Sequence, residues 1–127
     1  MALIERDMPI VVRINAADSP WHADDLATVA GLPIHAIMLA KAETTADVDR
    51  VRQVSGRPVI ALVETARGMA ACEQIATFAA RLAFGSIDYA ADLAMGHSRE
   101  SLLSARSRLV LDRALPWSLE MTWIGRY

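Results

Sequence analysis

Short apolar runs alternate with longer amphipathic stretches along the chain. Residues 9–15 are rich in β-branched side chains, and residues 34–39 form a second apolar run. Residues 58–63 form an unbroken apolar run, which is typical of a strand buried on both faces of a parallel sheet. Residues 81–84 lead into residues 85–88, which we interpret as a short fourth strand with its exit loop. The pattern therefore predicts four strands.

A helical pattern follows each predicted strand. Ser19 and Pro20 are typical of an N-cap and a first helical position, and Gly31 would end the first helix. Thr44 or Thr45 is expected to cap the second helix, which Gly56 would end. The inner face of this second helix is expected to hold three valines, Val48, Val51 and Val54.

Two more helices are predicted in the second half of the chain. One would open at Gly68 and bury the apolar residues Met69, Cys72, Ile75 and Ala76. The other would start from an N-cap at Ser98 and bury Leu102, Ala105, Leu109 and Val110. Strands and helices thus alternate, which predicts the α/β class with parallel strands joined by right-handed crossovers.

The predicted strand ends are evenly spaced. They fall near Asn15, Lys41, Glu64 and Asp88, which are 26, 23 and 24 residues apart. This spacing matches the βα units of a (β/α)8 TIM barrel, and four units are half of one. A complete barrel takes typically about 250 residues, and this chain has 127. We therefore expect a partial barrel of about four units, present as an open sheet, paired with a second copy, or as a fragment.

The last twelve residues do not continue this pattern. Residues 116–127 include two tryptophans and a tyrosine, and they show no further strand and helix alternation. They are either a native cover for an apolar edge or sequence appended by a truncation or frameshift. The second explanation is slightly favoured because the pattern stops within a unit. We divide the chain into a barrel domain at 1–115 and an atypical tail at 116–127.

Composition excludes several classes of protein. With 54% hydrophobic and 22% charged residues, the chain can bury a core, and disorder is excluded. A net charge of −2 gives no electrostatic basis for binding nucleic acid or an anionic membrane. No apolar run approaches the roughly 18–20 residues of a membrane helix. The single cysteine, Cys72, cannot form an internal disulfide, so we expect a cytoplasmic protein.

Charged residues follow the predicted strands where ligands bind in parallel α/β proteins, at the carboxyl ends. Arg13, Lys41, Glu64 and Asp88 would meet at this rim. Glu64 and Asp88 could hold Mg²⁺, which is bound by one or two carboxylates together with water and substrate oxygens. The alternative for Glu64 is a strand-end ion pair with Arg67 or Lys41, and the residues alone leave both interpretations open.

Three further positions are candidate substrate contacts. The guanidinium of Arg13 suits a substrate carboxylate, or it could pair with Asp18 or Glu43 instead. Gly68 and Gly85 could let the backbone approach a ligand. From the residues alone, a helix start at Gly68 and a tight strand exit at Gly85 are the simpler explanations. We keep all three as candidate substrate-binding residues.

Other catalytic motifs are absent. His22, His35 and His97 are scattered, and we interpret them as structural or exposed. Ser86, Asp88 and His97 do not form a recognisable triad, because no GxSxG motif precedes them. The sequence also lacks GxGxxG, Walker A and HExxH motifs.

Five segments in order resemble one known family. They are VVRIN, IMLAKAET, VIALVETARG, RLAFGSIDYAADL and ARSRLVL. Together they resemble the HpcH/HpaI aldolase and citrate lyase β-subunit family, specifically its citryl-CoA/malyl-CoA lyase branch. The resemblance covers most of the chain, from about Pro9 to Leu115, and the segments around Glu64 and Asp88 are its most specific part.

This resemblance implies a TIM barrel and Mg²⁺-dependent, reversible carbon–carbon cleavage of a 3-hydroxyacyl-CoA to an acyl-CoA and a keto acid. Glu64 and Asp88 would ligate Mg²⁺, Arg13 would bind substrate oxygens, and Lys41 would add positive charge to the rim in a catalytic role. The family's first and last barrel strands have no counterpart here. Half a barrel exposes sheet edges and an apolar surface, so we expect a homo-oligomer.

Two alternatives to this function stay open. The chain could be a non-catalytic remnant of the family that acts as an assembly or partner-binding module. It could also act on a free hydroxy-keto acid in place of an acyl-CoA, as HpaI-type aldolases do, although the GSIDYAADL segment favours the CoA branch.

Overall fold

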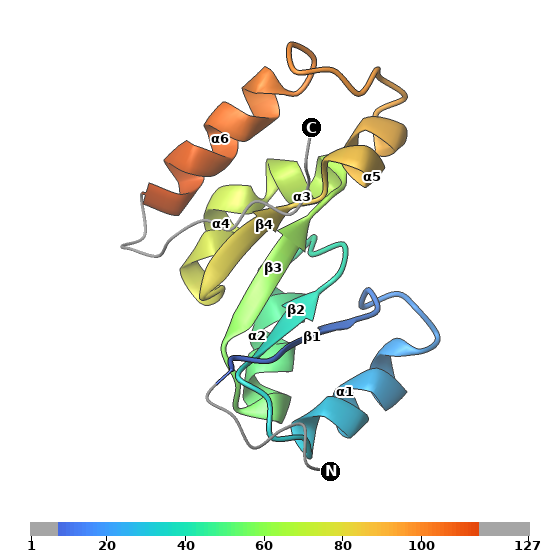
Figure 1. The fold of residues 1–127 in the computed structure, drawn as a ribbon, viewed down its shortest axis with the longest axis vertical. Helices are drawn as coiled ribbons and strands as arrows, with labels where there is room; N and C mark the ends of the chain where they lie inside the picture. Colours follow the sequence, from blue (N-terminus) through green and yellow to red (C-terminus); the bar gives the residue numbers. More distant parts are fainter. Residues whose placement is uncertain (1–7, 115–127) are drawn as a thin grey trace.

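The computed structural model describes residues 8–114, which form a parallel sheet and helices that follow its strands (Figure 1). The first four elements are β1 (Val11–Ile14), α1 (His22–Ala30), β2 (Ala36–Leu39) and α2 (Thr45–Ser55). They are followed by β3 (Val59–Val63), α3 (Ala66–Ala70), α4 (Cys72–Phe78), β4 (Arg81–Phe84), α5 (Ser86–Asp92) and α6 (Leu103–Ala114). The predicted alternation of strands and helices is confirmed.

The four strands pair in chain order, β1-β2-β3-β4, and every pair is parallel. Ile14 pairs with Leu39, and Val63 pairs with Phe84, so the carboxyl ends of all four strands lie along one edge of the sheet. Parallel strands in sequential order are the arrangement of consecutive units of a barrel.

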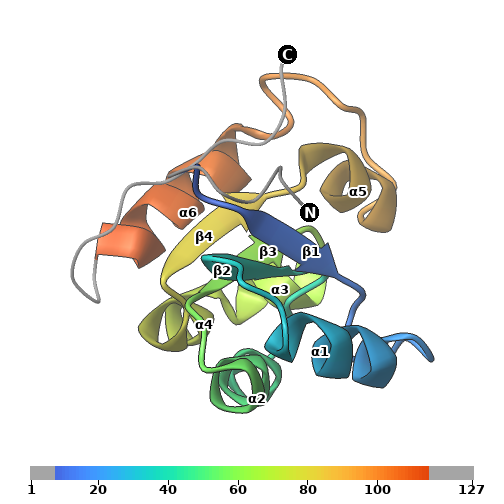
Figure 2. The same ribbon diagram turned by 60° about the horizontal axis from the view of Figure 1, so that its bottom comes forward.

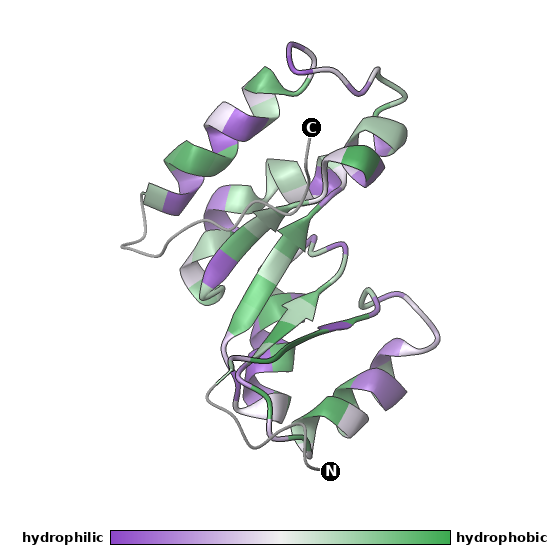
Figure 3. Ribbon diagram, viewed as in Figure 1, coloured by the Kyte–Doolittle hydropathy of each residue, from purple (hydrophilic) through white to green (hydrophobic). Residues whose placement is uncertain are grey.

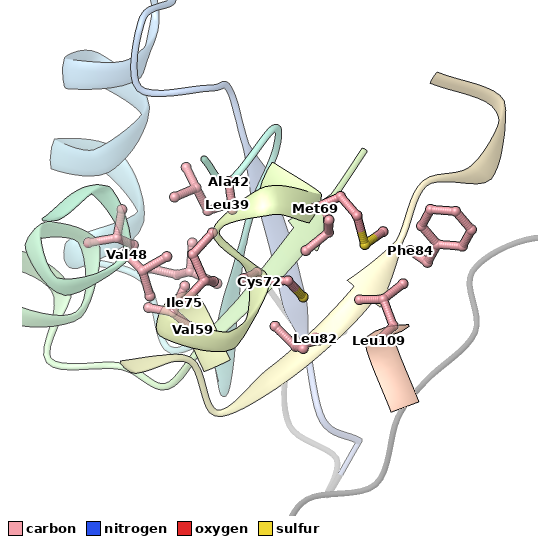
Figure 4. Close-up of a cluster of buried hydrophobic side chains, with 14 of the residues drawn as sticks. Leu39, Ala42, Val48, Val59, Met69, Cys72, Ile75, Leu82, Phe84 and Leu109 are labelled. Atoms are coloured by element: carbon pink, nitrogen blue, oxygen red, sulfur yellow. The ribbon is translucent and has the colours of Figure 1, made fainter. Parts of the chain in front are cut away.

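Helices cover one face of this sheet. α1 packs on α2, α2 on α4, and α4 on α6. Figure 2 shows α1, α2 and α4 side by side below the strands. The main core lies between these helices and the sheet, where Cys72 and Ile75 of α4 lie near Val59 and Leu82 (Figure 4). Burial of this apolar surface is the main source of the fold's stability.

The opposite face of the sheet is also apolar, and most residues of the strands are hydrophobic (Figure 3). Met38, Leu62 and Ala83 form a second, smaller cluster there, with Ile60 packed against it. A cavity of about 500 Å³ extends along this face and is lined in part by Met38, Ile60 and Val11. In Figure 2, α1, α2 and α4 lie together on one side of the strands.

Two helices start later than their serines predict. α1 begins at His22, and the hydroxyl of Ser19 accepts a hydrogen bond from the Trp21 N–H at 3.2 Å. α6 begins at Leu103, and the hydroxyl of Ser98 accepts from the Ser101 N–H at 3.1 Å. The predicted N-caps were therefore wrong, because each serine caps a turn that precedes its helix.

The helix predicted to open at Gly68 begins at Ala66. The hydroxyl of Thr65 accepts a hydrogen bond from the Gly68 N–H at 3.0 Å, which makes Thr65 the N-cap. This helix, α3, ends at Ala70, and α4 follows from Cys72 after the single residue Ala71. The prediction merged the two helices because their apolar residues share one periodic pattern.

Residues 85–88 are not a strand with an exit loop. The strand is β4, and Gly85 leads directly into α5, where the Tyr89 N–H donates to the Gly85 carbonyl at 3.0 Å. Asp88 therefore lies in the first turn of a helix. α5 was not predicted, because its seven residues are too few to establish a helical period.

The second helix agrees closely with its prediction. Thr44 caps α2 by accepting a hydrogen bond from the Asp47 N–H, and Gly56 ends it in a left-handed conformation with a φ of 65°. Val48 and Val51 are buried, but Val54 is 54% exposed. At 3.6 residues per turn, Val54 lies about 240° around the helix from Val48, which places it away from the inner face.

The predicted inner face of the last helix is partly wrong. Ala105 and Leu109 are buried, whereas Val110 is 46% exposed. Asp112 takes the next inward position and is 1% exposed. Both of its carboxylate oxygens accept from Nε of Arg108, at 2.8 and 2.7 Å. A buried carboxylate with such a partner avoids the cost of an unpaired charge.

The thiol of Cys72 is buried beneath α6. Burial, together with the nearby Asp112 carboxylate, raises the pKa of this thiol to about 12. We expect the native protein to react with iodoacetamide at pH 8 on the order of a thousandfold more slowly than the urea-unfolded chain, because the thiolate is the reactive form. Mass spectrometry of the alkylated protein measures this rate. Equal rates in the native and unfolded states would contradict the packing described here.

Residues 1–7 and 115–127 lie outside the described part of the chain. The atypical tail at 116–127 and the domain boundary at 115 therefore stay predictions. Between residues 8 and 114, no helix combines the length and apolarity needed to cross a bilayer.

Candidate functional site

The carboxyl edge of the sheet brings two acidic residues together. Glu64 directly follows β3, and Gly85 directly follows the neighbouring strand β4. The Gly85 N–H donates to the Val63 carbonyl at 3.0 Å, so these two strand ends stay in register. Asp88 then returns toward this edge from the first turn of α5. The predicted meeting of residues 64 and 88 at one rim thus has a defined structural basis.

Glu64 is held in place by the main chain. Its side chain is buried, with 5% of the residue exposed. Its Oε1 accepts a hydrogen bond from the Lys41 N–H at 3.0 Å. Lys41 adopts a left-handed conformation with a φ of 47°, which is uncommon for a residue other than glycine. The loop after β2 therefore accepts a strained backbone at the residue that orients Glu64.

The carboxyl groups of Glu64 and Asp88 interact directly. Burial raises the pKa of Glu64 above its ordinary value, and a hydrogen bond with Asp88 raises it further by favouring the protonated form. The negative charge of Asp88 acts in the same direction, whereas the Lys41 amide and the charge of Arg13 oppose it. Two carboxyl groups close enough to share a proton are also close enough to share a cation.

Between residues 8 and 114, Glu64 forms no ion pair with Arg67 or Lys41. The described residues thus lack the strand-end ion pairs that were the alternative to a metal site. Within the same range, Arg13 forms no ion pair with Asp18 or Glu43 either. Arg13 lies on β1, and its charge favours the ionised form of Glu64.

The raised pKa of Glu64 makes stability depend on pH. The folded protein binds the Glu64 proton more tightly than the unfolded chain does. The protonated side chain therefore makes its full contribution to the free energy of unfolding below the ordinary pKa of 4.5. It is lost as pH rises from there through the raised pKa. We therefore expect Glu64→Gln, which cannot ionise, to gain stability relative to the wild type as pH increases. Urea unfolding from pH 4 to 8 in EDTA measures this difference.

Comparison of the wild type with Glu64→Gln isolates the contribution of Glu64 to the pH dependence of stability. The pKa of Asp25 is lowered by its hydrogen bonds to the Asn15 main chain and side chain, so this group changes stability with the opposite sign. It is present in both proteins and cancels in the difference. A stability difference that does not change with pH would contradict the environment assigned to Glu64.

Lys41 contacts the site through its main chain. Its exposed side chain lines a separate rim cavity of about 230 Å³ together with Asp18, Glu43 and Asp47. The structure therefore places the Lys41 amide, and not its ammonium group, against Glu64. Catalytic roles for the side chains of Lys41 and Arg13 stay predictions.

Gly68 lies in α3, where this helix packs against the loop after β2. A methyl group at this position would collide with the Ala42 carbonyl oxygen, so glycine allows α3 to pack against the loop after β2. Gly85 lies between β4 and α5, beside Glu64. These are contacts within the protein, and substrate contacts of Gly68 and Gly85 stay predictions.

Several residues that shape the rim were not predicted from the sequence. Asp92 of α5 accepts a hydrogen bond from the Ala66 N–H at 2.7 Å and so ties α5 to the start of α3. The hydroxyl of Ser86 lies 3.0 Å from Nε2 of His97, which connects α5 to the loop before α6. Thr65 is of a residue type that favours the N-cap position, so it carried a readable N-cap signal. No sequence pattern indicated the other two contacts.

The donor set fits magnesium. Between residues 8 and 114, no cluster of three or more His, Cys, Asp and Glu side chains could hold a metal ion, so this part of the chain would supply Glu64 and Asp88 as ligands. Mg²⁺ is typically bound in this way, through one or two carboxylates, and keeps several waters or substrate oxygens. A structural zinc site would require more protein ligands.

Known proteins resemble this chain in sequence and in fold. The model of the HpcH/HpaI aldolase/citrate lyase family matches residues 2–114. The chain belongs to this family. The family resemblance expected from the five sequence segments is thereby confirmed.

Two curated members of the citrate lyase family illustrate the relationship. The citrate lyase subunit beta-like protein of Mycobacterium tuberculosis is 45% identical over 76 residues, which cover 56% of this chain and 27% of that protein. The malyl-CoA/beta-methylmalyl-CoA/citramalyl-CoA lyase of Chloroflexus aurantiacus is 34% identical over 110 residues, covering 73% of this chain and 32% of the lyase. The chain thus spans about a third or less of these relatives' length.

A solved structure shows the same fold. The chain superposes on CitE from Mycobacterium tuberculosis, in complex with magnesium, acetoacetate and coenzyme A, with a TM-score of 0.73 and 34% identity. The match covers 84% of this chain and 42% of CitE. The four-stranded parallel sheet of this family member is therefore part of a TIM-barrel-type fold, as expected.

Proposed function

We propose that this chain is part of a Mg²⁺-dependent carbon–carbon lyase that cleaves a 3-hydroxyacyl-CoA to an acyl-CoA and a keto acid. One observation carries the proposal. A buried glutamate and a second carboxyl group meet at the carboxyl edge of the sheet, in a chain that belongs to the HpcH/HpaI aldolase/citrate lyase family. The malyl-CoA lyase among the relatives and the complex of CitE with magnesium and coenzyme A support the substrate class.

In this reaction the bond between C2 and C3 of the acyl chain breaks. The C3 hydroxyl loses its proton and becomes the carbonyl of the keto acid, while the electron pair moves to C2 and is protonated to give the acyl-CoA. Bound Mg²⁺ would supply the positive charge that stabilises the developing oxyanion.

The chain's own residues would prepare the site for that chemistry. Glu64, oriented by the Lys41 amide, and Asp88 would hold the metal ion. Arg13, which forms no ion pair within residues 8–114, would bind the carboxylate of the keto-acid portion. Gly68 and Gly85 are the remaining candidates for substrate contact. Burial of Glu64 limits its exposure to water and strengthens its interaction with a cation.

A direct assay tests this proposal. The full chain is incubated with malyl-CoA or citryl-CoA in Mg²⁺ or in EDTA, and acyl-CoA and keto-acid products are quantified by mass spectrometry. We expect both products in equal amounts, only with Mg²⁺, and a large loss in Arg13→Met with Mg²⁺ binding retained. Equal turnover in EDTA would overturn the Mg²⁺-dependent lyase proposal, and absence of product from a chain that binds Mg²⁺ would favour the second candidate.

The second candidate is a non-catalytic module that self-associates. The observation that favours it is the apolar second face of the sheet, with Met38, Leu62 and Ala83 and a cavity of about 500 Å³. Exposed apolar faces and unpaired strand edges favour association. A second copy of this chain would provide four more strands, the number that closes a barrel.

Sedimentation equilibrium tests this homo-oligomer. We expect the wild type to associate and Ile60→Glu, which puts a charge on the second face, to sediment as a monomer. Val54→Glu is the matched control, because Val54 is 54% exposed on α2, away from that face. A monomeric wild type would exclude self-association.

A further inference from the structure

Gly85 occupies a position where its backbone conformation does not require glycine. Its φ is −89° and its ψ is 83°, and a negative φ is open to residues with side chains. Its N–H makes an ordinary hydrogen bond of 3.0 Å to the Val63 carbonyl. The reason for a glycine must therefore be space and not backbone conformation.

The space beside Gly85 is filled by Glu64. A methyl group on Gly85 would lie 2.6 Å from Oε2 of Glu64 and 2.7 Å from its Cβ. Carbon atoms in favourable contact are about 3.5–4.0 Å apart, so both contacts would be strongly repulsive. The Cβ of Glu64 is fixed to the β3 backbone, and rotation of the side chain cannot move it away. Any side chain at position 85 must displace Glu64 or separate the two strand ends.

We infer that Gly85 is a positioning residue for the candidate metal ligand Glu64. Its missing side chain leaves the room in which the Glu64 carboxyl group lies between β4 on its Oε2 side and the Lys41 amide on its Oε1 side. The inference rests on the proposed function and assigns Gly85 a task different from substrate contact. Gly85 acts through Glu64, whether or not substrate is bound.

Magnesium binding without substrate tests this inference. We expect Gly85→Ala to raise the Kd for Mg²⁺, measured by isothermal titration calorimetry, about 10–100-fold, the usual loss when a ligand's support is removed. Gly96→Ala is the matched control, because a methyl group there would meet no atom within 4 Å, and its Kd should equal that of the wild type. An unchanged Kd in Gly85→Ala, with only the KM for acyl-CoA raised, would overturn the inference in favour of substrate contact.

A second experiment requires neither Mg²⁺ binding nor a folded Gly85→Ala single variant. The cost of Gly85→Ala in melting temperature is compared in the wild type and in Glu64→Gly, which lacks the atoms that the methyl group would meet. We expect a large drop in the wild-type background and a much smaller one in Glu64→Gly, even where Gly85→Ala alone fails to fold. Equal drops in both backgrounds would overturn the inference. A wild type that does not bind Mg²⁺ would instead refute the proposed function, and this comparison would still test the contact.

Discussion

We expect Glu64→Gln to abolish stabilisation of the chain by Mg²⁺. An ion at about 100 times its Kd stabilises the folded state by ~2.7 kcal/mol, which raises the melting temperature of a domain of this size by roughly 10 °C. Glutamine keeps an oxygen that can accept from the Lys41 amide, but it lacks the charge that attracts a divalent cation. Thermal unfolding of wild type and variant with and without Mg²⁺ measures the difference.

The same experiment extends to the second ligand and to a control. Asp88→Asn should lose the response to Mg²⁺ as well, because one carboxylate alone would have to hold the ion. Glu73→Gln should retain it, since Glu73 is a half-exposed residue of α4 whose nearest ion-pair contact, with Arg108, is 4.0 Å long. A full Mg²⁺ response in Glu64→Gln would show that the ion binds elsewhere.

The strands could be predicted from the sequence because both faces of this parallel sheet are apolar, which needs continuous apolar runs. The run at 58–63 contains all of β3, and the order of residues alone places the charged residue that follows it, Glu64, at the carboxyl edge. A charge directly after a buried strand has to leave the core there. The hydrophobic pattern was therefore sufficient to predict the fold class and the position of Glu64, one of the two candidate metal ligands.

The rest of the site depends on geometry that no pattern records. The pattern assigns Asp88 to an exit loop, but this residue reaches Glu64 from a seven-residue helix too short to show a period. The predicted contribution of Lys41 was its charge, whereas its amide, set by a φ of 47°, makes the contact. Buried Asp112 likewise breaks the apolar pattern of α6, and only its pairing with Arg108 explains it.

Phe84 connects the core to the candidate site, so its removal should affect both. The side chain is 2% exposed on the helix-covered face of β4, and its ring packs edge-on against Tyr89 of α5, with centroids 5.3 Å apart. Phe84→Ala should cost about 3–5 kcal/mol, because it removes buried apolar surface and leaves a cavity. This is a large part of the roughly 5–15 kcal/mol that stabilises a typical domain.

Phe84→Ala should also weaken Mg²⁺ binding, because the Phe84 ring contacts the helix that carries Asp88. α5 carries Asp88, and loss of the Tyr89 contact should let this helix move relative to Glu64, so we expect weaker Mg²⁺ binding at temperatures where the variant is still folded. Phe78→Ala is the matched control, because Phe78 is 37% exposed at the end of α4. Its removal should lower the free energy of unfolding far less and should leave Mg²⁺ binding unchanged. Urea unfolding and calorimetric titration measure the two effects separately. Equal destabilisation by the two substitutions would contradict the central position of Phe84, and a destabilised Phe84→Ala with wild-type affinity would show that Asp88 is held independently of the core.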